Sequence, residues 1–133
     1  MEETFLLVEE LRFKMKILLV EDDRKVGAFL EEGLRQEGFL VDWAHDGDEA
    51  VELAGAGAYD IILLDFMLPK RNGLHVAAEI RRLGQETPIL MLTARDSAED
   101  VRRGRAAGAN DYMGKPFKFD DLLDRIHALA RPG

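Results

Sequence analysis

The sequence predicts an α/β domain in which a parallel sheet is covered by helices on both faces. Five short apolar segments of strand length recur along the chain, and each is followed by a segment whose apolar residues repeat at helical spacing. Most of the strand segments are branched aliphatic residues with little alternation, which is typical of parallel strands buried on both sides. Because strand and helix alternate in short units, right-handed crossovers should make all five strands parallel.

The expected strands are residues 16–20, 39–44, 61–64, 88–92 and 110–113. The helix after the first strand ends at Gly38, and the helix after the second strand begins behind Asp46-Gly47 and ends at Gly55 and Gly57. These glycines follow the last apolar residue of each helical pattern, so they act as stop signals.

The third helix should begin at Asn72-Gly73 and turn Val76, Ile80 and Leu83 toward the core. The last helix is expected to turn five apolar residues inward, namely Phe119, Leu122, Ile126, Leu129 and Ala130.

The fourth helix combines a capping signal with an unusual charge. Asp96 followed three residues later by Glu99 has the form of a capped helix start. The apolar stripe behind it is thin, and Arg102, Arg103 and Arg105 make this helix basic in an acidic protein.

Length and composition fit one domain with a sizeable core and exclude several classes of protein. The chain has 133 residues, a net charge of −8 and no cysteine, so disulfides and thiolate metal sites are excluded. No apolar run approaches the roughly 20 residues that span a bilayer, and no signal peptide is evident. We expect a cytoplasmic domain without membrane contact and without direct nucleic-acid binding, because phosphate backbones select basic surfaces.

The first 14 residues do not resemble the rest, and Met15 has the form of a second start. They are either an upstream addition or a short helix that packs on a partner through Phe5, Val8 and Leu11. We therefore divide the chain into an N-terminal extension (1–14), a domain (15–131) and residues 132–133, which begin a linker or end the chain.

Polar residues follow the predicted strands in a set that suggests chemistry. Asp22 and Asp23 follow the first strand, Asp65 the third, Thr93 the fourth and Lys115 the fifth. In an open parallel sheet these ends share one edge, where ligands bind. Three carboxylates in one crevice repel unless a cation lies among them, and a hard, oxygen-liganded ion such as Mg²⁺ fits. With a lysine and a hydroxyl to bind phosphoryl oxygens, one carboxylate is free to attack phosphorus, so the pattern predicts aspartate phosphorylation.

Each of these residues also has a purely structural interpretation. Asp22 or Asp23 could cap the first helix, Thr93 could be a turn hydroxyl, and Lys115 could be solvated. Asp65 is harder to explain this way, because it directly follows four buried aliphatic residues. The combination of all five residues at strand ends favours the functional interpretation.

At these motifs the sequence closely resembles the response-regulator receiver domain of two-component signalling, and in its last helix the OmpR/PhoB branch. The matching motifs are Ile17-Leu18-Leu19-Val20-Glu21-Asp22-Asp23, Asp65-Phe66-Met67-Leu68-Pro69 with Gly73 beyond, Leu92-Thr93-Ala94, Gly108-Ala109-Asn110-Asp111-Tyr112 and Lys115-Pro116-Phe117. The match covers residues 16 to about 131. It implies a flavodoxin-like, doubly wound (βα)₅ fold with strand order 2-1-3-4-5.

The resemblance implies that Asp65 accepts a phosphoryl group from a sensor histidine kinase. Asp23 and Asp65 would ligate Mg²⁺ through their side chains, Asp22 mostly through water, and the Met67 backbone carbonyl would complete the protein's share. The domain would not be an enzyme beyond its own phosphorylation and slow autodephosphorylation.

The resemblance also implies a conformational switch. Lys115 would pair with the phosphoryl group, with a cis bond to Pro116, while Thr93 moves toward the phosphoryl group and Tyr112 turns inward. The switch would control an output, either transcription through a DNA-binding domain absent from this chain or, for a stand-alone receiver, a protein–protein interaction.

The expected signalling face, formed by the helix over 97–107, the strand over 110–113 and the last helix, departs from its relatives. Arg102 and Arg105 stand where the branch usually has apolar residues, and charges are costly in an interface core unless they are paired. We therefore expect a monomer or a weak dimer.

Two other classes fit the residues less well. A haloacid-dehalogenase-type phosphatase would need a second acid two residues after the nucleophile, where Met67 stands. A flavodoxin-type FMN-binding module would need a phosphate loop rich in Ser, Thr and Gly after the first strand, where Glu21-Asp22-Asp23 would repel phosphate.

Overall fold

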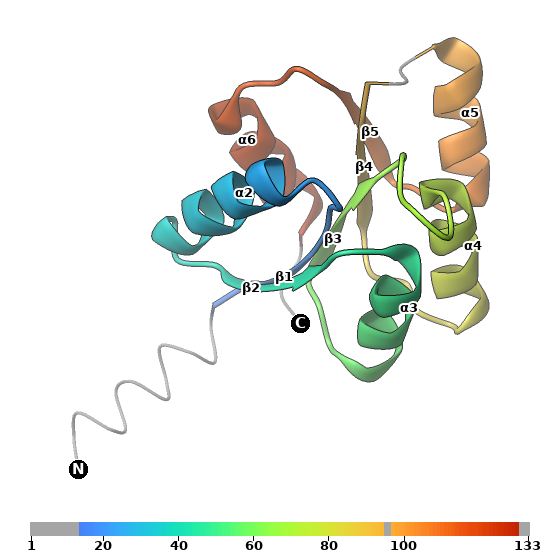
Figure 1. Ribbon diagram of the computed structural model, residues 1–133, viewed down its shortest axis with the longest axis horizontal. Helices are drawn as coiled ribbons and strands as arrows, with labels where there is room; N and C mark the ends of the chain where they lie inside the picture. Colours follow the sequence, from blue (N-terminus) through green and yellow to red (C-terminus); the bar gives the residue numbers. More distant parts are fainter. Residues whose placement is uncertain (1–13, 95–96, 131–133) are drawn as a thin grey trace.

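Strands and helices alternate through residues 14–94 and 97–130, which are the residues described in the computed structural model (Figure 1). The strands are β1 (Lys16–Val20), β2 (Leu40–Ala44), β3 (Ile61–Asp65), β4 (Ile89–Thr93) and β5 (Asp111–Gly114). The helices are α2 (Arg24–Gln36), α3 (Gly47–Ala56), α4 (Gly73–Arg82), α5 (Ala98–Ala107) and α6 (Phe119–Leu129). The predicted extension lies outside the described residues, apart from Lys14.

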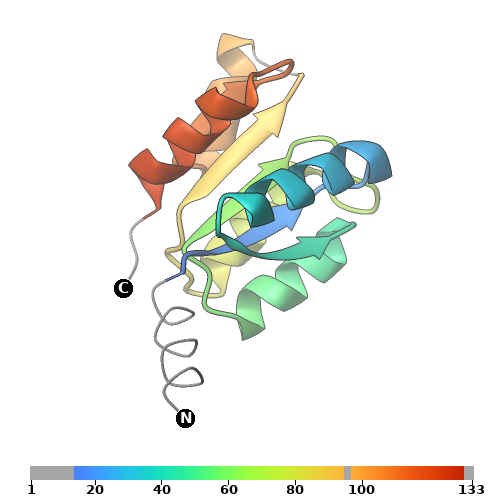
Figure 2. The same cartoon turned by 90° about the vertical axis from the view of Figure 1, so that its left-hand side faces the viewer.

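The five strands form one parallel sheet in the order β2-β1-β3-β4-β5, which confirms the predicted topology. Figure 2 shows the arrows of β1 (blue), β2 (teal) and β4 (yellow) running in the same direction. Helices α2 and α6 cover one face, and α3, α4 and α5 cover the other (Figure 1). All strands therefore end at the same edge, where α/β sheets of this kind bind their ligands.

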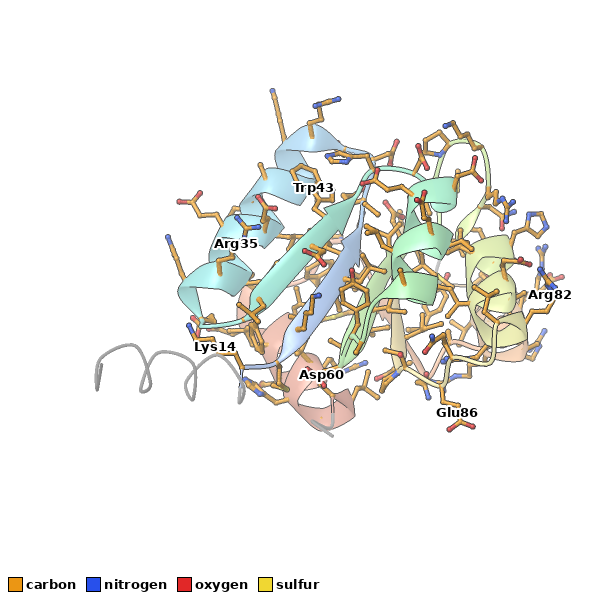
Figure 3. The ribbon with its side chains drawn as sticks, turned by 90° about the horizontal axis from the view of Figure 1, so that it is seen from below. Lys14, Arg35, Trp43, Asp60, Arg82 and Glu86 are labelled. Atoms are coloured by element: carbon orange, nitrogen blue, oxygen red, sulfur yellow. The ribbon has the colours of Figure 1, made fainter. Side chains whose placement is uncertain are left out.

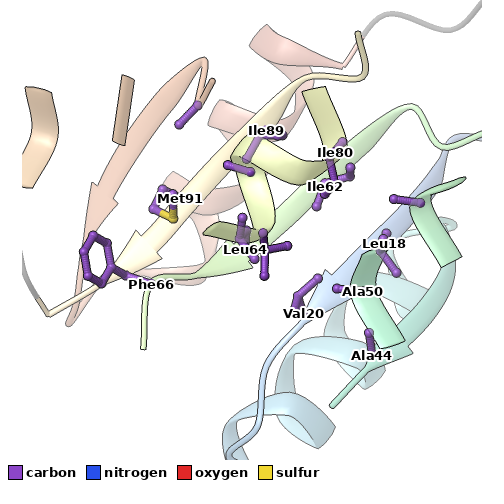
Figure 4. Packing of buried hydrophobic residues seen from close by; sticks show 14 of the residues in the cluster. Leu18, Val20, Ala44, Ala50, Ile62, Leu64, Phe66, Ile80, Ile89 and Met91 are labelled. Atoms are coloured by element: carbon purple, nitrogen blue, oxygen red, sulfur yellow. The ribbon is translucent and has the colours of Figure 1, made fainter. Parts of the chain in front are cut away.

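Alternate residues of the central strands build two separate cores, because successive side chains of a strand point to opposite faces. On one face, Leu18 and Leu64 pack in a cluster with Ala50 and Ile80 of the covering helices (Figure 4). On the other face, Leu63 belongs to a cluster that includes residues of α2 and α6. The sheet is thus buried on both sides, as its aliphatic strand sequences predict.

The ends of two elements differ from the sequence prediction. Leu83, predicted to face the core, is 46% exposed, because α4 ends at Arg82 and Leu83 leaves its buried stripe. Thr93, predicted to follow a strand, is the last residue of β4 and pairs with Gly114 of β5.

The start of α5 also corrects the predicted cap. Ser97 is the N-cap: its Oγ accepts a hydrogen bond from the Asp100 backbone N–H (3.1 Å) and donates one to Asp100 Oδ2 (2.8 Å). The predicted cap, Asp96, lies outside the described residues. Asp100 is only 8% exposed, and the hydrogen bond from Ser97 offsets part of the cost of burying its carboxylate.

No helix within 14–94 and 97–130 combines the length and the apolar character that crossing a bilayer requires.

Candidate functional site

The ends of β1 and β3 bring acidic residues together at one edge of the sheet. Val20 pairs with Leu64, so the residues that follow them, Glu21 and Asp65, are neighbours. Carboxylate oxygens of Glu21, Asp22 and Asp65 all lie within 4.8 Å of one another. Glu21 and Asp65 are only 3% and 7% exposed, whereas Asp22 is exposed. This acidic cluster is therefore buried on one side and open to solvent on the other.

Asp23 has a different place. Its Oδ1 accepts hydrogen bonds from the backbone N–H groups of Lys25 (2.9 Å) and Val26 (3.1 Å), which makes it the N-cap of α2. The structure thus brings Asp22 and Asp65 together as predicted, but it groups them with Glu21 rather than with Asp23. Of the two acids that could cap the first helix, Asp22 and Asp23, it is Asp23 that does so.

Lys115 reaches into the acidic cluster from the end of β5. Its Nζ lies 3.0 Å from Glu21 Oε1 and 3.1 Å from Asp65 Oδ2. The Lys115 backbone N–H donates to Thr93 O (2.7 Å), and the Lys115-Pro116 bond is cis, as the resemblance implies. The alternative that Lys115 is merely solvated is therefore wrong, since its ammonium group bridges two buried carboxylates.

The buried charges of the acidic cluster perturb one another. Burial, followed by the hydrogen bond and negative charge of Asp65, raises the pKa of Glu21 to about 7, although Lys115 acts in the opposite direction. Burial alone would lower the pKa of Lys115, but the hydrogen bonds and charges of Glu21 and Asp65 outweigh it and raise that pKa. Three carboxylates and one ammonium group leave an excess of negative charge, so a cation is favoured here.

Replacing Glu21 with Gln should stabilise the metal-free protein at pH 8. The pKa of Glu21 is about 7 in the folded protein, above its ordinary value of 4.5, so the folded state binds the proton more tightly than the unfolded state does. The free energy of unfolding therefore decreases as pH rises from about 4.5 to about 7. Glutamine carries no such charge. Urea unfolding in EDTA should therefore show a gain of order 1–3 kcal/mol at pH 8 that shrinks toward pH 4.5. A Glu21→Gln protein less stable than wild type at pH 8 would contradict this electrostatic account.

Thr93 and Met67 flank the acidic cluster. Thr93 is fully buried at the end of β4, the strand next to β3. The Met67 backbone N–H donates to Asp65 Oδ1 (3.1 Å), while Met67 as a whole residue is 55% exposed. The backbone of Met67, and not its side chain, therefore belongs to the site.

Tyr112 lies in β5 and is 9% exposed. Its ring packs against α5 at Gly104, where an added Cβ would stand only 3.2 Å from two ring carbons. In this structure the ring is thus already directed inward, into the cluster that contains Met91.

Glu21 is the site residue that sequence reasoning missed, although a signal for it exists. It directly follows the apolar run of β1 just as Asp65 directly follows that of β3. Equal offsets from two adjacent parallel strands place two residues side by side. The two acids that follow Glu21 obscured this correspondence.

The donor set of the site suits a hard divalent cation. Carboxylate oxygens are among the ligands Mg²⁺ prefers, and the carboxylates of Glu21, Asp22 and Asp65 are the donors gathered here. A carboxylate beside an ammonium group and a cation has the elements required for nucleophilic attack on a phosphoryl group.

Comparison with known families finds a match over most of the chain. Residues 17–127 match the sequence model described as "Response regulator receiver domain". Among curated proteins, the chain is 44% identical over 117 residues to the transcriptional regulatory protein DltR of Streptococcus agalactiae, covering 88% of this chain and 52% of that protein. It is 44% identical over 119 residues to CusR of Escherichia coli K12, covering 90% and 52%. The chain thus spans about half the length of these transcriptional regulators.

Among solved structures, the chain is similar to the receiver domain of sensor histidine kinase PA1611 from Pseudomonas aeruginosa PAO1. The TM-score is 0.81 at 37% identity, and the match covers 87% of this chain and 97% of that one. That structure is described as having a magnesium ion coordinated in the active site cleft.

Proposed function

Because the chain belongs to the response-regulator receiver family, we propose that Asp65 accepts a phosphoryl group from a sensor histidine kinase in a Mg²⁺-dependent reaction in the cytoplasm. The observation that carries this proposal is the buried Asp65 carboxylate, held 3.1 Å from Lys115 and beside two further acids. In the reaction, an Asp65 oxygen forms a bond to phosphorus while the bond between phosphorus and the kinase histidine nitrogen breaks. The product is an acyl phosphate and a neutral histidine.

Each neighbour of Asp65 has a role in this reaction. Lys115 Nζ is within reach of the reacting carboxylate and would pair with a phosphoryl oxygen. The Met67 N–H donates to one Asp65 oxygen and so orients the carboxylate. The Thr93 hydroxyl would donate to a second phosphoryl oxygen. Mg²⁺, when bound, would neutralise charge on the phosphoryl oxygens and the surrounding carboxylates.

Incubation with acetyl phosphate and Mg²⁺ tests this function. Intact-mass analysis should detect one added phosphoryl group, which hydroxylamine removes because it cleaves acyl phosphates, and which does not form in EDTA. A folded protein that takes up no phosphoryl group in Mg²⁺ would overturn the proposal.

We assign Asp22, Asp65 and the Met67 carbonyl as the metal ligands, with Glu21 beside them. We assign Asp23 only the role of N-cap of α2. Asp22→Asn should therefore raise the Mg²⁺ dissociation constant at least about tenfold, which is the range seen even for groups that contact a metal only indirectly. Asp23→Asn is the matched control, because asparagine also caps helices well. NMR titration with Mg²⁺ measures both constants. If Asp23→Asn weakened Mg²⁺ binding as much as Asp22→Asn does, Asp23 would be a metal ligand, as the family resemblance implies.

We propose that phosphorylation is read on the face formed by α5, β5 and α6, through movement of Thr93 and Tyr112. The transcriptional regulators that the chain resembles support an output in transcription, through a DNA-binding domain not included in these residues. A receiver that acts through protein–protein contacts is the alternative. Purification of the full-length gene product and its footprinting on DNA would distinguish the two.

The charges of this face favour a monomer or a weak dimer. Arg102 and Arg103 are exposed on α5, and Arg105 is engaged by Asp111 (3.5 Å), which also binds Arg125 (2.8 Å). Two copies packed through this face would bring exposed guanidinium groups into the interface. Light scattering of the beryllofluoride-activated protein should give a monomer mass at micromolar concentration, and a tight dimer there would contradict this expectation.

A further inference from the structure

Trp43, in β2, contacts the backbone of the acidic cluster without being part of it. Its Nε1–H donates a hydrogen bond of 2.8 Å to the backbone oxygen of Glu21. The next β2 residue, Ala44, accepts a hydrogen bond from the Glu21 backbone N–H at 3.1 Å. Two consecutive residues of β2 therefore hold both backbone groups of Glu21, one through a side chain and one through the main chain.

Helix α2 is shaped to accept the indole ring of Trp43. Gly27 is buried on this helix, and a Cβ added there would lie 2.0 Å from Trp43 Cζ2, which is too close for any side chain. The Trp43 ring is therefore packed against the helix backbone at Gly27, one turn after the cap residue Asp23. Figure 3 shows Trp43 beside this helix. The ring also stacks with His45, with ring centroids 4.5 Å apart. The indole that donates to Glu21 is thus packed against both α2 and His45.

The Trp43 hydrogen bond is accepted by the peptide group between two residues of the acidic cluster, Glu21 and Asp22. The carbonyl group of Glu21 belongs to the same planar peptide unit as the amide nitrogen of Asp22. A hydrogen bond to that oxygen therefore fixes the orientation of the peptide that joins two residues of the acidic cluster. Asp22 is exposed and no salt bridge to it is found among the described residues, so its carboxylate depends on this backbone for its position.

We infer that Trp43 is a positioning residue for the Mg²⁺ site: its indole N–H orients the Glu21–Asp22 peptide, and Gly27 gives it the space to do so. The inference rests on the proposed function, because it assigns a role within the same metal site. The role assigned to Trp43 is therefore indirect, through the Glu21 backbone oxygen.

Trp43→Phe tests the hydrogen bond, because phenylalanine keeps an aromatic ring but lacks the N–H. The Mg²⁺ dissociation constant, measured by NMR titration of the folded protein with Mg²⁺ alone, should rise about tenfold, as expected for loss of a group that orients a ligand. Wild-type affinity in this variant would overturn the inference while leaving the proposed function intact. Failure of the wild-type protein to bind Mg²⁺ would overturn the proposed function itself, and the inference with it.

Gly27→Ala tests whether Trp43 needs the space that the missing side chain of Gly27 leaves on α2. It should weaken Mg²⁺ binding when Trp43 is present, but add nothing in a Trp43→Leu background, because leucine stops short of the added Cβ. The matched control is Gly33→Ala on the same helix, where the added Cβ would meet Phe119 (2.8 Å) on the side of α6. Gly33→Ala should leave the Mg²⁺ dissociation constant unchanged. Equal weakening by both alanines, or additive effects of Gly27→Ala and Trp43→Leu, would show that general destabilisation is the cause and would overturn the inference.

Discussion

Asp65→Asn is expected to take up no phosphoryl group from acetyl phosphate or from a kinase. The amide has no anionic oxygen to attack phosphorus, so the loss should be complete. The fold should survive, because asparagine has the same shape, can still accept the Met67 N–H, and leaves Lys115 its contact with Glu21 at 3.0 Å. Intact-mass analysis after incubation with acetyl phosphate and Mg²⁺ gives the result directly.

Asp60→Asn is the matched control for this experiment. Asp60 precedes β3, at the opposite end of the strand from Asp65, and its Oδ2 accepts the Lys16 backbone N–H at 2.7 Å. An asparagine oxygen can accept the same bond, so this variant should be phosphorylated like the wild type. A phosphoryl group that persists in Asp65→Asn would show that another acid is the acceptor, with Asp22 as the nearest exposed candidate.

Leu63→Ala is expected to have the largest effect on stability. Leu63 is fully buried in β3, the central strand of the sheet, and packs in the core on the side of α2 and α6. Truncation of such a leucine removes buried apolar contacts and leaves a cavity, at a cost of about 2–5 kcal/mol. Against a total stability of roughly 5–15 kcal/mol for a domain, this loss is severe. Urea unfolding in the presence of Mg²⁺ measures it.

Leu83→Ala makes the same chemical change at a residue that is 46% exposed. The sequence pattern predicts a core position for Leu83, whereas the structure puts it beyond the end of α4. We expect a cost of no more than about 1 kcal/mol, as for most surface substitutions. If Leu83→Ala were as damaging as Leu63→Ala, the sequence pattern would describe this residue better than the structure does.

The sequence by itself determined the fold class and the central acid of the site. Aliphatic runs of strand length, alternating with amphipathic segments, are local patterns, and they are sufficient to predict the five parallel strands and their helices. Asp65 was identifiable for a related reason: a carboxylate directly after four buried aliphatic residues is costly to bury, so its presence there indicates a function. Thr93 and Lys115 were found because they occupy equivalent ends of other strands.

Only the tertiary structure decided between the neighbouring acids Glu21, Asp22 and Asp23. All three follow β1, and their roles depend on the register with β3, which sets Glu21 beside Asp65, and on the first turn of α2, which uses Asp23 as its cap. The contact of Trp43 with Gly27 and Glu21 likewise joins three separate elements. Hydrophobic periodicity reports which face of an element is buried. It carries no information about which residues of two distant segments meet at the sheet edge, because strand pairing and side-chain packing between segments set those distances.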